Sequence, residues 1–245
     1  MILSSQFTCS ILLALSFLVN RAYGERGIIG YRTVQEWEAK QMNAYQKPFR
    51  DRVFDKDNAQ QNQLGHGLYL INEPASWNVP EWLTSWYCVV EADMDKFAET
   101  SKIWIPGQYT GLDKHGRKRS KPTQLWNWRA DNENTILEYI RVMGQPNPKK
   151  ALRFARVPAA PGKLQVVIPS DMVNRNTLDF SAQCWETKEE LFDYSSATVD
   201  WMNWEIAGDP DVADPEPSDS SDKKEEASWY QGWLDCIRGS GTCTW

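Results

Sequence analysis

The side chains that could do chemistry in this sequence are few, because its 245 residues include only two histidines, His66 and His115. A serine-hydrolase triad therefore has very few ways to form. Gly65 and Gly67 lack a third glycine at the spacing of a dinucleotide-binding fingerprint, and no P-loop motif occurs. The 33 acidic residues always offer carboxylate pairs of the kind that hydrolyse glycosides, but nothing singles out one pair. The common enzyme motifs are absent.

Four short segments nevertheless follow one another in a recognisable order. Arg32 stands in the run Tyr31-Arg32-Thr33, which reads as the end of a first strand. The run GHGLYL (65–70) comes next, with a proline soon after it, and YCVVEA (87–92) and KIWIP (102–106) follow. This order resembles the ADP-ribosyltransferase toxin superfamily, in particular its secreted enterotoxin-like and polymorphic-toxin branches and candidate secreted effectors of fungi. The resemblance covers about residues 27–170, and its motifs are short.

The resemblance implies roles for two residues and a substrate. The first-strand arginine, here Arg32, would hydrogen-bond the ribose and phosphates of NAD, a task that suits a fixed cationic fork. Tyr69, on the glycine-entered strand, would stack on the nicotinamide. A carboxylate on a later strand would bind the ribose hydroxyl and stabilise the oxocarbenium-like transition state as nicotinamide leaves. NAD is then a substrate, and ADP-ribose is transferred to a host protein by a secreted toxin or effector.

The third position departs from the family pattern. The strand that best fits the acidic strand is Lys163–Pro169, and its relevant residue is Gln165, which carries no charge. Glu133 and Glu138 are nearby acids, although they lie in a predicted helix. Two interpretations stay open. Either Glu133 or Glu138 acts as the catalytic carboxylate, or the fold survives without transferase activity as a secreted, non-catalytic binding protein.

The same residues also have purely structural interpretations. Arg32 could be a surface arginine or the partner of a core acid, and Tyr69 could be an ordinary core aromatic residue. Glu133 and Glu138 could be solvated helix residues. The run KHGRKRSK (114–121) could be only a charged loop; its sharper interpretations are a processing site after Lys118-Arg119 or a patch for an acidic partner.

The elements that must position these residues are predicted from hydrophobic patterning. Helices are expected at 35–45, with Trp37, Met42 and Tyr45 facing inward, and at 132–143, while 47–63 reads as a loop and 148–157 as a helix or a strand. Strands are expected at 28–34, 65–71, 86–92, 102–106, 163–169 and 198–206. The predicted fold class is α+β: an ADP-ribosyltransferase-like core of mixed sheets that form a cleft, with helices outside and disulfides for support.

An export signal is predicted at residues 1–24. Ile11–Val19 is an apolar run of signal-peptide length, and Ala22 and Gly24 place small side chains before a cleavage site near Glu25. A short membrane anchor is the alternative, but the run is too short to span a bilayer, and no later segment is apolar enough. We expect a secreted protein with no membrane span. Because NAD is scarce outside cells, the transferase interpretation also requires delivery into host cells.

Four cysteines remain once the signal, with Cys9, is removed. An even number in an exported chain predicts two disulfides. We favour Cys88–Cys184, which joins two core segments, and Cys236–Cys243 in the tail. Metal binding is disfavoured, because there is no CxxC pair and histidine is scarce.

Composition divides the mature chain into three parts. A transferase-like domain is expected over 25–207, a disordered acidic linker over 208–228 and a small Trp- and Cys-rich tail over 229–245. Removing Arg21 with the signal leaves 26 basic residues against 33 acids, a formal charge of −7. This balance argues against nucleic acid as a partner. We expect a monomer that meets a host protein.

Overall fold

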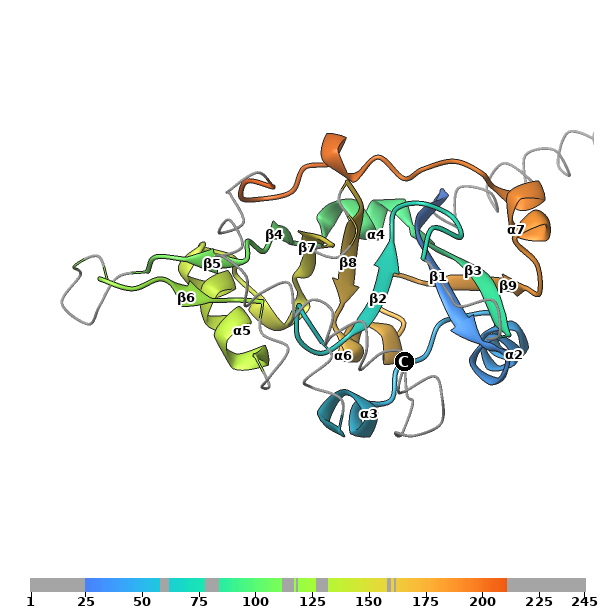
Figure 1. Cartoon of the computed structure of the whole chain (residues 1–245), viewed down its shortest axis with the longest axis horizontal. Coiled ribbons are helices and arrows are strands. Elements are labelled where there is room, and N and C mark those ends of the chain that lie inside the picture. Colours follow the sequence, from blue (N-terminus) through green and yellow to red (C-terminus); the bar gives the residue numbers. More distant parts are fainter. Residues whose placement is uncertain are drawn as a thin grey trace, which may run out of the picture.

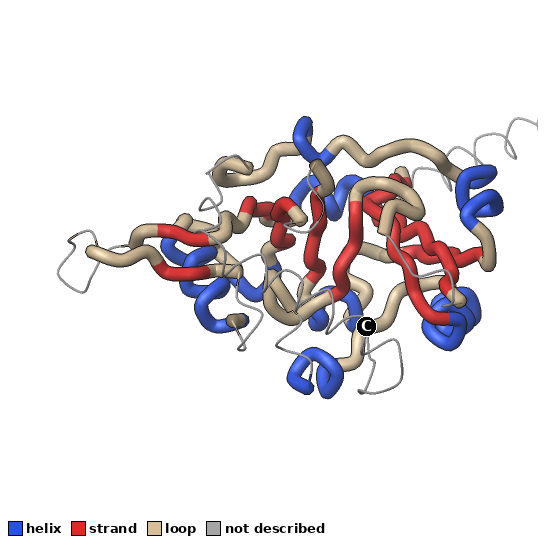
Figure 2. Tube along the Cα trace, in the orientation of Figure 1, coloured by secondary structure: helices blue, strands red, loops and turns tan. Residues whose placement is uncertain are grey.

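The computed structural model describes residues 25–57, 62–77, 84–111, 117, 119–126, 132–157, 160 and 162–210. Over these residues the chain is an α+β protein with one seven-stranded mixed sheet and a separate two-stranded sheet, which confirms the predicted fold class at that level. Figures 1 and 2 show the large sheet in the middle of the molecule and the helices around its periphery.

The elements follow in chain order. The strands are β1 (Arg26–Gln35), β2 (Leu68–Ile71), β3 (Ser85–Asp93), β4 (Lys102–Trp104), β5 (Gln108–Tyr109), β6 (Thr123–Gln124), β7 (Leu152–Arg156), β8 (Leu164–Ile168) and β9 (Ser181–Trp185). The helices are α2 (Glu36–Tyr45), α3 (Arg52–Asp57), α4 (Met94–Glu99), α5 (Glu133–Val142), α6 (Ser170–Asn174) and α7 (Lys188–Tyr194), with 3₁₀ turns η2 (Pro148–Lys150) and η3 (Trp201–Asn203).

The order of strands in the large sheet is β4-β7-β8-β2-β1-β3-β9. Only the β4–β7 pair is parallel among these neighbours; the others are antiparallel. Strands β1, β2 and β8 therefore lie side by side, with Tyr31 opposite Ile71 and Ile71 opposite Gln165. These are the three strands on which the sequence places Arg32, Tyr69 and Gln165.

Two parts of the sequence-based assignment are wrong. The segment 47–63, expected to be a loop, contains α3. The segment 198–206, expected to be a strand, is an extended stretch with the η3 turn in it. For 148–157, where a helix or a strand was expected, the chain forms the η2 turn followed by β7.

The segment 198–206 fails to pair as a strand because it belongs to a strap, residues 195–210, that crosses the sheet from α7 to β4 (orange in Figure 1). Trp201 is completely buried, and its indole Nε1 donates a hydrogen bond to the Ile29 carbonyl, 3.1 Å away. That carbonyl lies in a β-bulge of β1, where a Cβ on Gly30 would come within 2.9 Å of the Leu70 Cβ. The strap is thus anchored at a close approach that only glycine allows.

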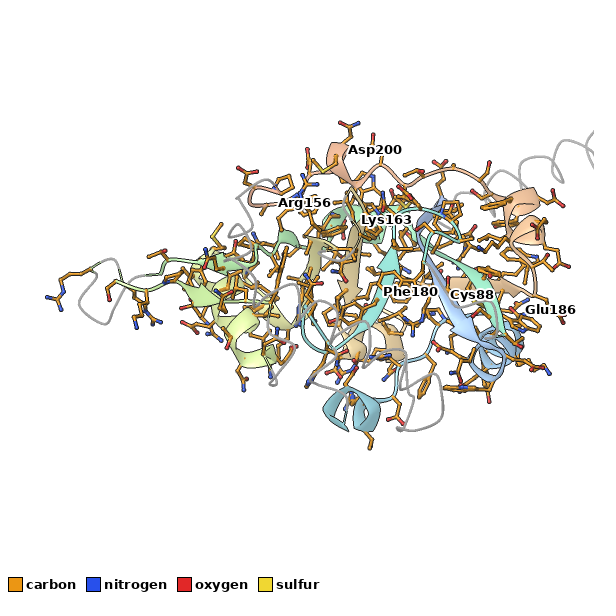
Figure 3. The ribbon with its side chains drawn as sticks, viewed as in Figure 1. Cys88, Arg156, Lys163, Phe180, Glu186 and Asp200 are labelled. Carbon is orange, nitrogen blue, oxygen red and sulfur yellow. A yellow bond between two sulfur atoms is a disulfide. The ribbon has the colours of Figure 1, made fainter. Side chains whose placement is uncertain are left out.

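The opposite edge of the sheet is closed by a disulfide between Cys88 on β3 and Cys184 on β9, as predicted. The two residues face each other in the strand register, with their Cα atoms 4.0 Å apart. Figure 3 labels Cys88 in this part of the molecule, whereas Asp200 lies in the strap and Arg156 lies beside it. Asn43 of α2 protects the outer edge of β9, because its amide group bonds both the N–H and the carbonyl of Cys184.

Helix α2 turns a different face inward from the one predicted. Met42 is buried as expected, but Trp37 and Tyr45 are 54% and 66% exposed. The buried positions are Glu38, Ala39 and Met42. In this orientation Glu38 reaches back to Arg32, as described below.

Several predictions concern residues outside the described ranges. These are the signal peptide at 1–24, all of the linker beyond Pro210, the tail at 229–245, the Cys236–Cys243 pair and His115. Within the described part of the chain, every helix is too short or too polar to cross a membrane.

Candidate functional site

The candidate site is built on the turn that leads into β2. Gly65 has a φ of +78°, and a Cβ there would lie 2.2 Å from the Glu133 Oε2 and 2.6 Å from the Arg153 Nη1. Glycine is therefore needed both for the backbone conformation and for space. The turn is held by Tyr69, whose hydroxyl accepts from the Leu64 N–H at 2.9 Å and donates to the Gly65 carbonyl at 2.8 Å. Burial raises the pKa of the Tyr69 hydroxyl far above its usual value, so it stays protonated.

Glu133 and Arg153 form a two-pronged ion pair against this turn. The Arg153 Nη1 and Nη2 lie 2.6 and 2.7 Å from the two carboxylate oxygens of Glu133, and Nη1 also donates to the Leu64 carbonyl. The Glu133 carboxylate accepts a further hydrogen bond from the His66 backbone N–H at 2.7 Å. Burial alone would raise the pKa of Glu133, but the guanidinium and the hydrogen bonds outweigh it and hold that pKa below its usual value. Glu133 is therefore an ionised, fully engaged carboxylate.

Arg32 forms a second buried ion pair. Its Nε lies 3.0 Å from Glu38 Oε1, and its Nη2 lies 3.5 Å from Glu38 Oε2. A third donor, Nη1, bonds the carbonyl of Tyr69 at 3.1 Å, across the β1–β2 pair. Arg32 is only 9% exposed, and Glu38 is 7% exposed. The position thus matches the interpretation of Arg32 as the partner of a core acid.

A third buried pair joins Arg50 to Asp55 of α3. Arg50 Nε lies 2.8 Å from Asp55 Oδ1, and the Ser170 hydroxyl donates to the other oxygen of the same carboxylate. Burial lowers the pKa of Arg50, and the positive charge of Arg32 lowers it further. The charges of Arg50 and Arg153 both act on Tyr69. We call Tyr69 and the three pairs around it the Tyr69 cluster.

The Tyr69 cluster contains four charged residues that the sequence did not indicate as site residues: Glu38, Arg50, Asp55 and Arg153. Arg153 had a visible signal, since it lies within the apolar run of β7 and is 0% exposed. Glu38 had a weaker signal, because it falls on the same helix face as Met42, one turn before it. The other two pair across a surface turn whose folding the sequence does not show.

Gln165 and Glu138 lie apart from the cluster in different ways. Gln165 is buried on β8, where its amide nitrogen donates to the side-chain oxygen of Gln63 and to the Arg156 carbonyl. It adjoins the turn through Gln63 and contributes no charge. Glu138 is exposed on α5 and pairs with Arg141. It lies five residues after Glu133, which at 100° per residue places it well around the helix from the cluster.

The arrangement neutralises charge inside the protein. The three arginines of the Tyr69 cluster are matched by three carboxylates, and each ion pair is further hydrogen-bonded, as buried charges require. The described residues contain no group of three or more His, Cys, Asp or Glu side chains arranged to hold a metal ion. Chemically, the cluster can fix the positions of the buried elements that it joins. Because each of its arginines is paired with a carboxylate, an incoming anion would have to displace one of these carboxylates.

The comparison with known proteins gives one result. No curated protein and no solved structure matches this chain. A family model described as a family of unknown function, DUF5910, matches residues 62–209. The match covers Tyr69, Glu133, Arg153 and Gln165 as well as the disulfide, and it ends with the strap; β1, α2 and α3 precede it. The chain therefore belongs to the DUF5910 family.

Proposed function

We propose that this protein is exported and acts by binding a partner protein, and that its transferase-like sheet carries a structural charge cluster where an active relative would bind NAD. The observation that carries the proposal is the state of Arg32. Its guanidinium is buried against the Glu38 carboxylate and the Tyr69 carbonyl. To bind an NAD phosphate it would have to release Glu38 and leave that carboxylate buried without its cation. Breaking such a pair costs about 3–5 kcal/mol.

Two further features of the site support the same proposal. On β8 the position expected to stabilise a developing cation is Gln165, whose amide is already bonded to Gln63 and Arg156. Glu133, an ionised carboxylate beside the turn that Tyr69 holds, is bound by both terminal nitrogens of Arg153. Each candidate group is therefore already committed to a neighbour in the fold.

Export is supported by the signal-like segment at 1–24 and by the Cys88–Cys184 disulfide, because disulfides persist in oxidising compartments.

A binding role is supported by exposed aromatic side chains on and after α2. Trp37, Tyr45 and Phe49 are each about half exposed or more, and such residues are enriched in protein interfaces.

The second candidate function is NAD-dependent ADP-ribosyl transfer to a host protein. It is favoured by the adjacency of β1, β2 and β8, the order that places Arg32, Tyr69 and Gln165 on neighbouring strands. In this case Glu133 would be the catalytic carboxylate, since it lies against the turn that Tyr69 holds, whereas Glu138 does not. The substrate would enter only after the Arg32–Glu38 pair opens.

Titration of the mature protein with NAD separates the two functions. A ligand at 100 times its dissociation constant adds about 2.7 kcal/mol to the free energy of unfolding. We expect no heat of binding, no rise in the unfolding temperature and no release of nicotinamide. Protection by NAD, together with nicotinamide release that is lost in Arg32→Ala and retained in Arg26→Ala, would refute the proposal and establish the transferase. Arg26 is a suitable control because it lies on the same strand and is solvent-exposed.

A further inference from the structure

Helix α5 leads into an exposed loop that the Tyr69 cluster does not explain. The inner face of the helix is apolar and has four buried residues: Ile136, Leu137, Tyr139 and Ile140. Of the ten residues 141–150 that follow, eight are exposed and two are partly buried. We call these residues the 141–150 loop. Figure 1 shows α5 at the opposite end of the molecule from α2, so the loop is separate from the exposed aromatic residues near α2.

The backbone of this loop has a defined shape. Gly144, with a φ of +76°, ends α5, and the N–H groups of Gly144 and Gln145 donate to carbonyls in the last turn of the helix. This pair of hydrogen bonds is a common way for glycine to end a helix. Pro148 then begins the η2 turn, which is closed by a hydrogen bond from the Lys150 N–H to the Asn147 carbonyl. The loop is therefore ordered before it meets a ligand.

The loop is basic, although the chain as a whole is acidic. The formal charge of the chain is −6, yet residues 139–170 contain six lysines and arginines and no acidic residue. Three of the six belong to the loop: Arg141, Lys149 and Lys150. Arg141 is paired with Glu138, whereas the two lysines end the η2 turn and are exposed. Lys149 and Lys150 therefore present two positive charges, adjacent in sequence, to the solvent.

The same loop exposes apolar side chains. Val142 is 56% exposed and Met143 is 42% exposed, and the exposed Pro146 follows them. Methionine is flexible and polarisable, and it is common at binding surfaces that adapt to apolar partners. Apolar side chains beside cations can hold a protein at an anionic membrane surface, because the apolar groups enter the acyl boundary while the cations meet the headgroups.

We propose that the 141–150 loop binds the surface of a membrane that contains anionic lipid. Lys149 and Lys150 meet the anionic headgroups, and Val142 and Met143 enter the interface beside them. The size of the loop favours lipid over protein, since a stable protein interface uses about 20–30 residues a side and the loop has ten. The inference does not depend on the proposed function, because the loop contains no residue of the Tyr69 cluster.

Sedimentation of the mature protein, residues 25–245, with lipid vesicles tests the proposal. One set of vesicles contains equal parts of phosphatidylcholine and phosphatidylserine, and the other contains phosphatidylcholine alone. We expect the protein to sediment only with the first set, and we expect added salt to release it because salt screens the charges. Sedimentation to the same extent with both sets, or with neither, would overturn the proposal.

A charge variant and a matched control test whether the loop is the binding site. Lys149→Ala/Lys150→Ala should weaken partitioning onto the anionic vesicles about 30-fold, because each cation near an anionic surface contributes roughly a factor of five. Lys47→Ala/Arg175→Ala removes the same charge from exposed positions elsewhere on the molecule. This control should change the partitioning less than about twofold, since distant charges are screened. Equal losses in the two variants would show that the loop is not the site.

A second variant tests the apolar part of the proposal. Val142→Ser/Met143→Ser keeps every charge and should weaken the partitioning about tenfold, because less apolar surface leaves water. Every substituted residue in these variants is exposed, so their unfolding temperatures should match that of the wild type. Unchanged partitioning of the serine variant would contradict insertion into the interface. Binding of the wild type to polyglutamate but not to the anionic vesicles would overturn the lipid surface and indicate an acidic protein instead.

Discussion

The β3–β9 edge and the Tyr69 cluster hold distant parts of the chain together by opposite means. At the β3–β9 edge, Cys88 and Cys184, 96 residues apart, are joined covalently among apolar neighbours such as Met42. In the Tyr69 cluster, Arg153 reaches Leu64 and Glu133 reaches His66 through charge and hydrogen bonds. A disulfide stabilises mainly by restricting the unfolded chain. A buried ion pair gains little over an apolar pair, but it is costly to break.

This difference predicts which solution condition, redox state or pH, affects the stability of each region. The stability of the β3–β9 edge should depend on the redox state and should not change with pH. The stability of the Tyr69 cluster should depend on pH and should not change with reductant. The following predictions test that contrast, from the largest expected effect to the smallest.

Removing one charge from the cluster should have the largest effect. Glu133→Gln leaves Arg153, which is 0% exposed, without its carboxylate, and should lower the free energy of unfolding by about 3–5 kcal/mol. Glu138→Gln on the same helix is the matched control. Its pair with Arg141 is exposed, so the loss should stay below about 1 kcal/mol. Urea denaturation measures both, and equal effects would contradict the structural role of Glu133.

Removing the disulfide should cost about 2–4 kcal/mol, through the greater freedom of the unfolded chain. The double variant Cys88→Ala/Cys184→Ala, or the wild type in reductant, should show this loss in urea denaturation. Combining the double variant with Glu133→Gln should give an additive loss if the two regions act independently. A clear departure from additivity would show that edge and cluster are coupled.

Acidification should weaken the cluster before the edge. The pKa of Glu133 is lowered in the folded state from its reference value of 4.5. A carboxyl with a depressed folded pKa contributes stability that is present above the unfolded value and lost as the pH falls through the folded value. Unfolding free energy should therefore decline more steeply below pH 4.5 in the wild type than in Glu133→Gln. Cys88→Ala/Cys184→Ala should keep the wild-type slope, and a flattened slope in that variant would break the comparison.

The smallest effect should come from a helix cap beside the crosslinked edge. Thr187 and Glu190 form a reciprocal capping box at the start of α7. Thr187→Ala removes the hydroxyl that accepts the Glu190 N–H and should cost about 1 kcal/mol. Thermal unfolding in oxidised and reduced protein should show the same shift. A shift that appears only after reduction would mean that the cap and the disulfide stabilise the same local unit.

Much of the scaffold follows from local pattern. The strands β1, β2, β3, β4 and β8 and the helices α2 and α5 are predicted within a few residues of their observed bounds. Alternation along a strand and composition along a helix depend on each segment alone. The Cys88–Cys184 pair also follows from the sequence, because counting and core-like surroundings leave few alternatives. The shorter elements α3 and the η3 turn were missed because they depend on contacts outside themselves.

The site shows the limit of the same reasoning. The sequence pointed to Arg32, Tyr69, Glu133, Glu138 and Gln165. Four of them lie on or beside the segment 63–69, whereas Glu138 is exposed and pairs with Arg141. The sequence could not show that Glu38 and Arg153 would engage Arg32 and Glu133. The residues that flank an arginine in the sequence do not show whether it faces a solvated cleft or a buried carboxylate.

The sequence by itself therefore determined the places of β1, β2, β3, β4, β8, α2 and α5, one disulfide and the basic run at 114–121. Tertiary structure alone decided which charged side chains meet. It rotated α2 so that Glu38 points inward and Trp37 outward, and it turned the segment 195–210 into a strap fixed by Trp201. The physical reason is that hydrophobic periodicity is a property of one segment, whereas the cost of burying a charge is set by the partner that arrives from elsewhere.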